Sequence, residues 1–134
     1  MQIRRAEEHD IPLLTRWDGH IRSAELHHAI QQQRIYLLKV QQQFAGWLRF
    51  QLFWDSIPFM NLLYVLEDYR GNGYGKALVT HWEMEMKQFG YSTAMTSTSS
   101  QEYAQHFYYQ LGYHTIGGFF PHEEPYEILL EKLL

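Results

Sequence analysis

The sequence contains no cysteine and only four prolines among its 134 residues. Without cysteine there are no disulfides, no thiolate-bound zinc or iron–sulfur clusters, and no cysteine nucleophile. Basic residues are also scarce, since 11 Lys and Arg face 15 Asp and Glu and give a formal net charge of −4. Proteins that bind nucleic acid usually carry a basic surplus or stripe, so we expect no nucleic-acid partner.

Long apolar runs are missing as well. Residues 1–8 contain several charged side chains and no apolar run. No later stretch approaches the roughly eighteen apolar residues that a membrane-spanning helix needs. We therefore expect no signal peptide, no membrane association and a cytoplasmic location. The chain is rich in apolar side chains, which make up 46% of its residues and can fill the core of one domain over residues 1–134.

The eight histidines show no pattern typical of a metal site. His27 and His28 are adjacent and so diverge on a helix, while His81 and His106 fall on different predicted helices. No H-E-x-x-H or comparable ligand spacing occurs. We therefore predict that the protein binds no metal.

The hydrophobic pattern predicts an α/β or α+β protein. A strand at residues 3–6 precedes two short amphipathic helices, which begin after Asp10 and near Ser23. Aromatic and β-branched residues on both sides of a polar turn at residues 41–43 predict an antiparallel hairpin. Residues 59–66 are almost continuously apolar, which is typical of a central strand buried on both faces.

The second half of the chain predicts further alternation of helices and strands. A helix to about Phe89 is followed by a strand at residues 94–97, a helix that stops at Gly112, and strands within residues 113–120 and 127–133. Ser99 and Glu102 have the spacing of a capping box before the second of these helices. The sequence therefore predicts a mixed, mostly antiparallel sheet of about seven strands flanked by about four helices.

A glycine-rich loop lies between the predicted central strand and the helix after it. Residues 70–75 spell R-G-N-G-Y-G, and the free N–H groups where a helix begins favour anions such as phosphate or pyrophosphate. A Walker A loop would place its first glycine at Arg70 and its Ser or Thr at Ala77. A dinucleotide fingerprint would place its last glycine at Lys76. Both nucleotide motifs fit poorly, which leaves another anionic ligand or a turn that only permits tight packing.

Two motifs together resemble the Gcn5-related N-acetyltransferase (GNAT) superfamily. The acyl-CoA loop of that family, R/Q-x-x-G-x-G/A, is matched by residues 70–75 at every fixed position. A second family motif, A-x-x-F-Y-x-x-x-G-F/Y, is matched by Ala104, Phe107, Tyr108, Gly112 and Tyr113. The resemblance covers essentially the whole chain. It implies the GNAT acyl-CoA N-acyltransferase fold, with acetyl-CoA as cosubstrate.

The resemblance also implies a mechanism, in which a primary amine attacks the acetyl thioester directly in a ternary complex. Tyr108 stands at the family's position for the acid that assists the departing CoA thiolate. Backbone N–H groups of the glycine loop would hold the pyrophosphate, and the pantetheine arm would pair with the end of the preceding strand. The residues implied to contact acetyl-CoA are Leu63, Tyr64, Val65, Arg70, Gly71, Asn72, Gly73, Tyr74, Gly75, Lys76, Gln101 and Tyr108.

The general base is less well defined. Many family members carry a carboxylate on the central strand, where this chain offers only Asn61. Asp55, in the turn before that strand, is our first candidate for the base, acting directly or through water, followed by Glu25 and His27. The missing carboxylate also leaves an alternative, an acyl-CoA-binding regulatory module without efficient turnover.

The acceptor remains open between a small-molecule amine and a peptide amine. Trp47, Phe53 and Trp54 of the hairpin, with the acidic loop at residues 119–126, are expected to form an aromatic wall suited to a cationic amine. The alternative is that the tryptophans belong to the core and the loop is merely exposed. We expect the protein to act as a monomer or a homodimer.

Overall fold

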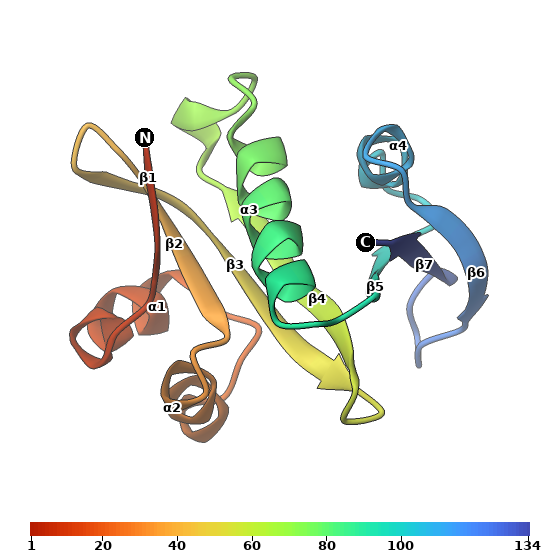
Figure 1. Ribbon diagram of the computed structural model, residues 1–134, viewed down its shortest axis with the longest axis horizontal. Coiled ribbons are helices and arrows are strands. Elements are labelled where there is room, and N and C mark those ends of the chain that lie inside the picture. The colour runs from red at the N-terminus through yellow and green to blue at the C-terminus, as the bar shows by residue number, and fades with distance from the viewer.

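The computed structural model describes all residues from 1 to 134. Seven strands form one sheet in the order β1-β2-β3-β4-β5-β7-β6, with four α-helices and two short 3-10 helices around it (Figure 1). This is the predicted fold. The elements are β1 (Gln2–Arg5), η1 (Glu8–Asp10), α1 (Ile11–Trp17), α2 (Ser23–Gln31), β2 (Ile35–Val40), β3 (Gln43–Phe53), β4 (Ile57–Val65), η2 (Glu67–Tyr69), α3 (Tyr74–Gln88), β5 (Thr93–Ser99), α4 (Ala104–Gln110), β6 (His114–Phe119) and β7 (Glu127–Leu133).

The sheet consists of two halves that meet at a short contact. All neighbouring strands are antiparallel except β4 and β5, which run parallel. These two strands are in register only at Phe59–Met95 and Met60–Thr96. Beyond Met60 they diverge, so the second half of β4 keeps an edge that no strand of the protein covers. The half formed by β5, β7 and β6 lies to one side of α3 in Figure 1.

Helices pack on both faces of the sheet, with α1, α2 and α3 on the first half and α4 on the half that contains β5. On one face α1 and α2 enclose a core of seven buried residues that includes Leu14, Leu26 and Trp47. On the other face α3 and α4 pack over a larger core of 15 buried residues, among them Trp82 and Tyr108. None of the helices is both long and apolar enough to span a bilayer.

The predicted hairpin is present, and its turn has two residues. Val40 and Gln43 are paired, and the intervening Gln41 and Gln42 have φ of +50° and +65°. Two consecutive left-handed residues define the type I′ turn that matches the twist of antiparallel strands. Non-glycine residues adopt this conformation with strain, so the turn is less stable than the same turn with glycine.

Two local predictions are wrong. Ser99 and Glu102 do not cap α4, because that helix begins at Ala104 after Tyr103, which makes no side-chain cap hydrogen bond. The strand β4 is central in the sheet but not buried on both faces, since only Pro58 and Met60 along it are buried. The reason is the divergence of β5, which leaves the apolar residues of the second half of β4 beside open space.

Candidate active site

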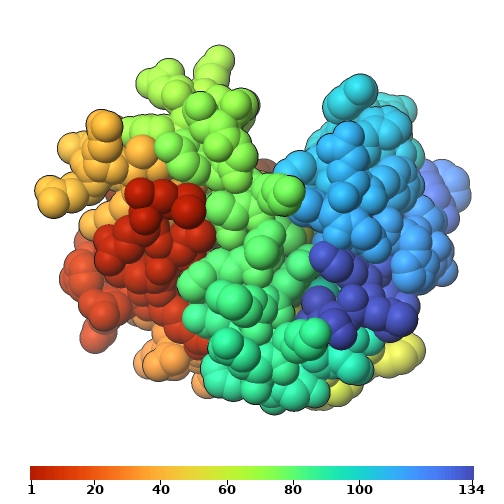
Figure 2. All heavy atoms as spheres, turned by 45° about the horizontal axis from the view of Figure 1, so that its top comes forward, coloured from red at the N-terminus to blue at the C-terminus, as the bar shows by residue number.

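A groove of about 510 Å³ runs over the free edge of β4, on the face of the sheet that carries α3 and α4. Figure 2 shows it as a deep notch between the residues near 70, in lime green, and the residues of α4, in cyan to blue. Its lining residues come from β4, from the loop into α3 and from α4. They are Leu63, Val65, Tyr69, Arg70, Gly71, Gly73, Tyr74, Gly75, Lys76, Ala104 and Phe107.

The glycine loop places free N–H groups at one end of this groove. Gly71 and Gly73 have φ of +78° and +79°, a conformation that favours glycine. Gly73 is the N-cap of α3, and the first helical hydrogen bond runs from the Ala77 N–H to the Gly73 carbonyl, at 3.0 Å. The N–H groups of the first turn therefore have no partner within the helix. A helix beginning with free N–H groups beside a groove is suited to bind a phosphate group.

Side chains of the loop hold it in place. Arg70 donates from Nε to the Val65 carbonyl at 2.8 Å, and its guanidinium lies 5.1 Å from the centre of the Tyr64 ring. Asn72 donates from Nδ2 to the carbonyls of Tyr69 and Arg70, each at 3.1 Å. These contacts tie the loop to the end of β4, so the loop and the free strand edge form one unit.

Most of the residues predicted to contact acetyl-CoA meet at this groove, and four do not line it. Gln101 is exposed at the junction of β5 and α4, Asn72 braces the loop, and the Tyr64 ring packs against Trp47 with centroids 5.2 Å apart. Tyr108 lies deeper. Phe107, the residue before Tyr108 in the family motif, lines the groove and packs against the core.

Tyr108 is buried next to the point where β4 and β5 diverge. Its ring is 7% exposed and contacts Phe107 and Tyr113, with ring centroids 5.2 and 5.7 Å away. Burial raises the pKa of Tyr108 to about 12, although the Thr96 hydroxyl acts in the opposite direction. Because of this raised pKa, the Tyr108 phenol is protonated at neutral pH. Thr96 itself donates to the Met60 carbonyl at 3.0 Å, across the last paired position of β4 and β5.

A second groove, also of about 510 Å³, lies on the opposite face between α2 and the β3–β4 hairpin. Asp55 and Glu25, two of the candidates for the base, both line it. His27 does not, because its Nδ1 lies 2.8 Å from the Ser23 carbonyl on the outside of α2. Asn61 lines this groove too, and its Oδ1 accepts a hydrogen bond from Gln51 at 2.9 Å.

A buried ion pair at this groove escaped the sequence analysis. Arg49 donates to Asp18 from Nε at 2.9 Å and from Nη2 at 3.4 Å, and Trp47 Nε1 donates to the same carboxylate at 3.2 Å. The sequence held one indication of this pair, which is the charged Arg49 within the apolar run at residues 47–50. A buried charge requires a partner of opposite charge. The partner could not be named from the sequence, since the two residues are 31 positions apart.

The predicted aromatic wall is not formed around this groove. Trp47 is 2% exposed and belongs to the core, as the alternative interpretation held. Trp54 is 78% exposed in the turn between β3 and β4, where its ring packs against Phe53 with centroids 4.9 Å apart. Polar and charged side chains dominate the lining instead.

One more carboxylate lies near the divergence of the strands. Neighbouring residues on a strand point to opposite faces, so Ser97 faces away from the side on which Thr96 contacts Tyr108. Ser97 donates from Oγ to Glu127 Oε2 at 2.7 Å. Glu127 is therefore on the face of the second groove, in the other half of the sheet.

Comparison of the sequence with known families gives a clear result. A profile of the acetyltransferase (GNAT) family matches residues 3–113. The chain belongs to the GNAT acetyltransferase family. Comparison with curated proteins finds no match.

Several solved structures share the fold. Ard1 from Thermoplasma volcanium is similar with a TM-score of 0.83 at 15% identity, over 99% of this chain and 97% of that chain. The ribosomal-protein-S18-alanine N-acetyltransferase from Escherichia coli has a TM-score of 0.80 at 19% identity, over 98% and 92% of the two chains. The PaiA N-acetyltransferase from Thermoplasma acidophilum, in complex with coenzyme A, has a TM-score of 0.71 at 14% identity, over 99% and 98%.

This GNAT protein thus presents two grooves that reach the same stretch of β4 from opposite faces. Leu63 lines the first groove and Asn61 lines the second, two positions earlier on the strand. The structure brings together no group of three or more His, Asp and Glu side chains placed to hold a metal ion. The chemistry that the arrangement offers is a phenol on one side of the sheet and carboxylates on the other.

Proposed function

We propose that the protein is an acetyl-CoA-dependent N-acetyltransferase that transfers the acetyl group to a primary amine by direct attack in a ternary complex. The observation that supports this most strongly is the pair of grooves that reach β4 from opposite faces. One groove suits a long, phosphate-bearing donor and the other a polar acceptor, so both substrates can be bound at the same time. The similar PaiA structure contains coenzyme A, which favours the same donor here.

The donor is proposed to lie along the free edge of β4 with its pyrophosphate on the glycine loop. The N–H groups from Arg70 to Lys76 would hold the pyrophosphate, and the backbone from Leu63 to Val65 would pair with the pantetheine arm. The N–H of Val65 or a neighbour on β4 would polarise the thioester carbonyl and stabilise the oxyanion of the tetrahedral intermediate. Tyr64 and Asn72 would contribute through their backbone, and a contact of Gln101 with the CoA arm stays a prediction.

Tyr108 is proposed to assist the departing thiolate. A CoA thiol has a pKa of about 8.5, like a free cysteine, and the pKa of Tyr108 is raised to about 12. Complete proton transfer from the phenol to the thiolate is therefore uphill. We infer that Tyr108 stabilises the developing thiolate by donating a hydrogen bond to the sulfur.

The acceptor amine must lose a proton, and the second groove offers carboxylates for that purpose. Asp55 remains our first candidate for the base, directly or through water, with Glu25 beside it on α2. Glu127 is a further candidate because it lies on the same face at the divergence of the strands. Comparison of Asp55→Asn, Glu25→Gln and Glu127→Gln by the pH dependence of kcat/KM separates them, since only loss of the base removes the acidic limb of the profile.

The test is release of CoA thiol from acetyl-CoA with a panel of primary amines, which this cysteine-free chain permits without background. Tyr108→Phe should lower kcat by about 10²-fold or more and leave the Kd of acetyl-CoA unchanged. Tyr109→Phe is the matched control, because Tyr109 is on the same helix but bonds Thr115 at the surface. Full activity of Tyr108→Phe would remove the assigned role.

The alternative of a regulatory module gives a different result in the same assay. A protein that only senses acyl-CoA would bind acetyl-CoA but release no thiol with any amine. Failure to bind either acetyl-CoA or CoA would contradict both functions.

A further inference from the structure

We propose that Arg49 recognises a carboxylate of the acceptor, so that the acceptor carries an amine and a carboxylate only a few bonds apart. This inference rests on the proposed function and names the acceptor class. It is carried by the geometry of the Arg49–Asp18 pair at the base of the second groove.

The guanidinium of Arg49 is fixed in one orientation. Its side chain is 9% exposed, and the Asp18 side chain that holds it is fully buried. Asp18 is itself held by Trp47 Nε1 at 3.2 Å and by the His20 N–H at 3.1 Å. A charged group held in this way is pre-organised, so little conformational entropy is lost when a ligand binds to it.

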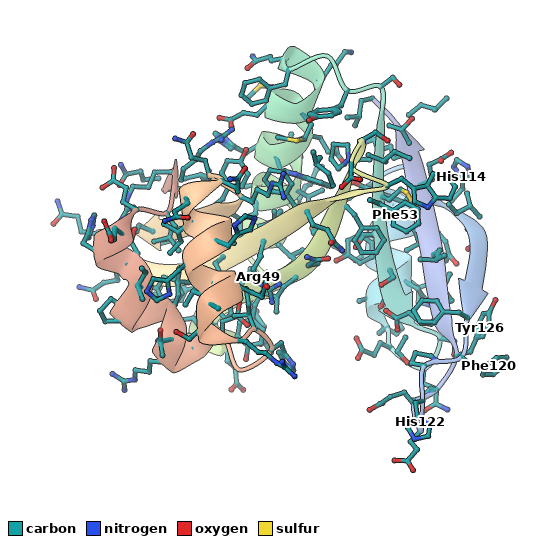
Figure 3. The ribbon with its side chains drawn as sticks, turned by 90° about the horizontal axis from the view of Figure 1, so that it is seen from below. Arg49, Phe53, His114, Phe120, His122 and Tyr126 are labelled. Carbon is teal, nitrogen blue, oxygen red and sulfur yellow. The ribbon has the colours of Figure 1, made fainter.

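The pairing with Asp18 leaves one edge of the guanidinium unused. Asp18 takes the edge formed by Nε and Nη2, while Nη1 has no partner within the protein and is not enclosed. Because Arg49 lines the second groove, this free Nη1–Nη2 edge is available there. Two parallel N–H bonds on one edge match a carboxylate, which can accept both of them. In Figure 3, Arg49 lies beside α2, and the β6–β7 loop with Phe120 and His122 lies across an open space from it.

The charges around the groove favour an acceptor with both signs. Arg22 and Arg34 also line the groove, and neither forms an ion pair within the protein. Glu25 and Asp55 supply negative charge, while His20 and His28 add positive charge only when protonated. A polyamine would place its cationic groups beside unpaired guanidinium groups, which is repulsive. A zwitterion finds an opposite charge for each of its ends.

The register of the sheet places Arg49 close to the donor edge of β4. Arg49 pairs with Leu62 across the β3–β4 ladder, and neighbouring strands are about 4.8 Å apart. The backbone of Arg49 is thus one strand away from the edge of β4 against which the thioester is proposed to lie, and its side chain lines the second groove. An acceptor bound in this groove can place its carboxylate on Arg49 and its amine at β4 if the two groups are only a few bonds apart.

The experiment compares acids with amides as acceptors. A panel of free L-amino acids and of their carboxamides is tested by thiol release with acetyl-CoA. We expect kcat/KM to be about 10-fold to 100-fold higher for the acid of a matched pair, the range of one charge-assisted hydrogen-bonded contact. A second panel of tripeptides beginning with Asp or Glu, matched to Asn or Gln, distinguishes a side-chain carboxylate from that of a free amino acid.

Arg49→Lys tests the residue itself. Lysine keeps a positive charge beside Asp18 but lacks the pair of parallel N–H donors, so the preference for acids should fall while amides are still acetylated. Arg4→Lys is the matched control, because Arg4 holds Asp10 with two hydrogen bonds of 2.8 and 3.0 Å outside both grooves. That variant should keep the full preference. Thermal melting of both variants reports their folding.

The possible outcomes separate this inference from the proposed function. Thiol release at equal rates for acids and amides with the unaltered protein would refute carboxylate recognition and leave the N-acetyltransferase function standing. An acid preference as large in Arg49→Lys as in the unaltered protein would refute the role of Arg49. Binding of neither acetyl-CoA nor CoA would overturn the proposed function and the inference together. The comparison on the unaltered protein needs no variant to fold.

Discussion

The glycine loop allows a sharp test, because the effect of Gly73→Ala can be worked out from the structure. Gly73 has φ of +79°, and a Cβ built on it meets no heavy atom within 4 Å. The substitution therefore causes no steric clash, and only the left-handed backbone opposes it, by about 1–2 kcal/mol. The unfolding entropy of a domain this size is about 0.28 kcal/mol/K, so Tm should fall by about 4–7 °C.

Gly90→Ala is the matched control for this strain. Gly90 follows α3 at its other end, has φ of +97° and also leaves open space for a Cβ. Both variants should therefore lose similar stability. Gly73→Ala alone changes the end of the donor groove, because relaxation of its backbone turns the free N–H groups of the first helical turn away from their common direction.

Thermal melting with and without acetyl-CoA separates the two effects. With ligand at 100 times its Kd, the unaltered protein should gain about 2.7 kcal/mol, or about 10 °C in Tm. Gly90→Ala should melt lower but keep that gain, and Gly73→Ala should lose most of it. A full ligand gain in Gly73→Ala would refute the assignment of the loop to the donor. An unchanged Tm of the free variant would refute the argument from backbone strain.

Three further predictions concern stability. Gln42→Gly should raise the free energy of unfolding by about 0.5–1 kcal/mol, because Gln42 has φ of +65° in a type I′ turn; urea unfolding measures this, and a loss of stability would contradict the turn type. Tyr113→Phe should lower it by about 1.5–3 kcal/mol, since the Tyr113 hydroxyl donates to the buried Glu83 at 2.7 Å, and a change below about 0.5 kcal/mol in the same measurement would contradict this. Burial alone would raise the pKa of Glu85, but hydrogen bonds from a tyrosine and an arginine outweigh burial and lower that pKa below the ordinary 4.5. The unfolded chain therefore binds a proton at Glu85 more readily than the folded protein does. The free energy of unfolding should fall as the pH drops from about 5 to 3. In urea titrations over that pH range, the free energy of unfolding of Glu85→Gln should fall less than that of the unaltered protein. Parallel plots of this free energy against pH for the two proteins would refute the role of the carboxylate.

The sequence predicted the fold closely because most of its signals are local. Helical periodicity, the polar turn between β2 and β3, and the glycines before α3 act over a few residues, where chain geometry determines the structure. The end of β4 shows the limit of such patterns. Its continuous apolar residues predict burial on both faces, but a strand beside an open groove has the same composition. The periodicity of one strand does not report whether its neighbour stays beside it.

The sequence by itself determined the order of the elements, the loop at residues 70–75, the membership of the GNAT family and the position of Tyr108 within a family motif. Tertiary structure alone decided that β4 and β5 diverge, and that Asp55 and Glu25 share a groove which His27 does not reach. It also brought Arg49 to Asp18 and Ser97 to Glu127, pairs separated by 31 and 30 positions. Contacts of this range depend on how distant segments of the chain pack together within each half of the sheet, and no local pattern along the chain encodes that packing.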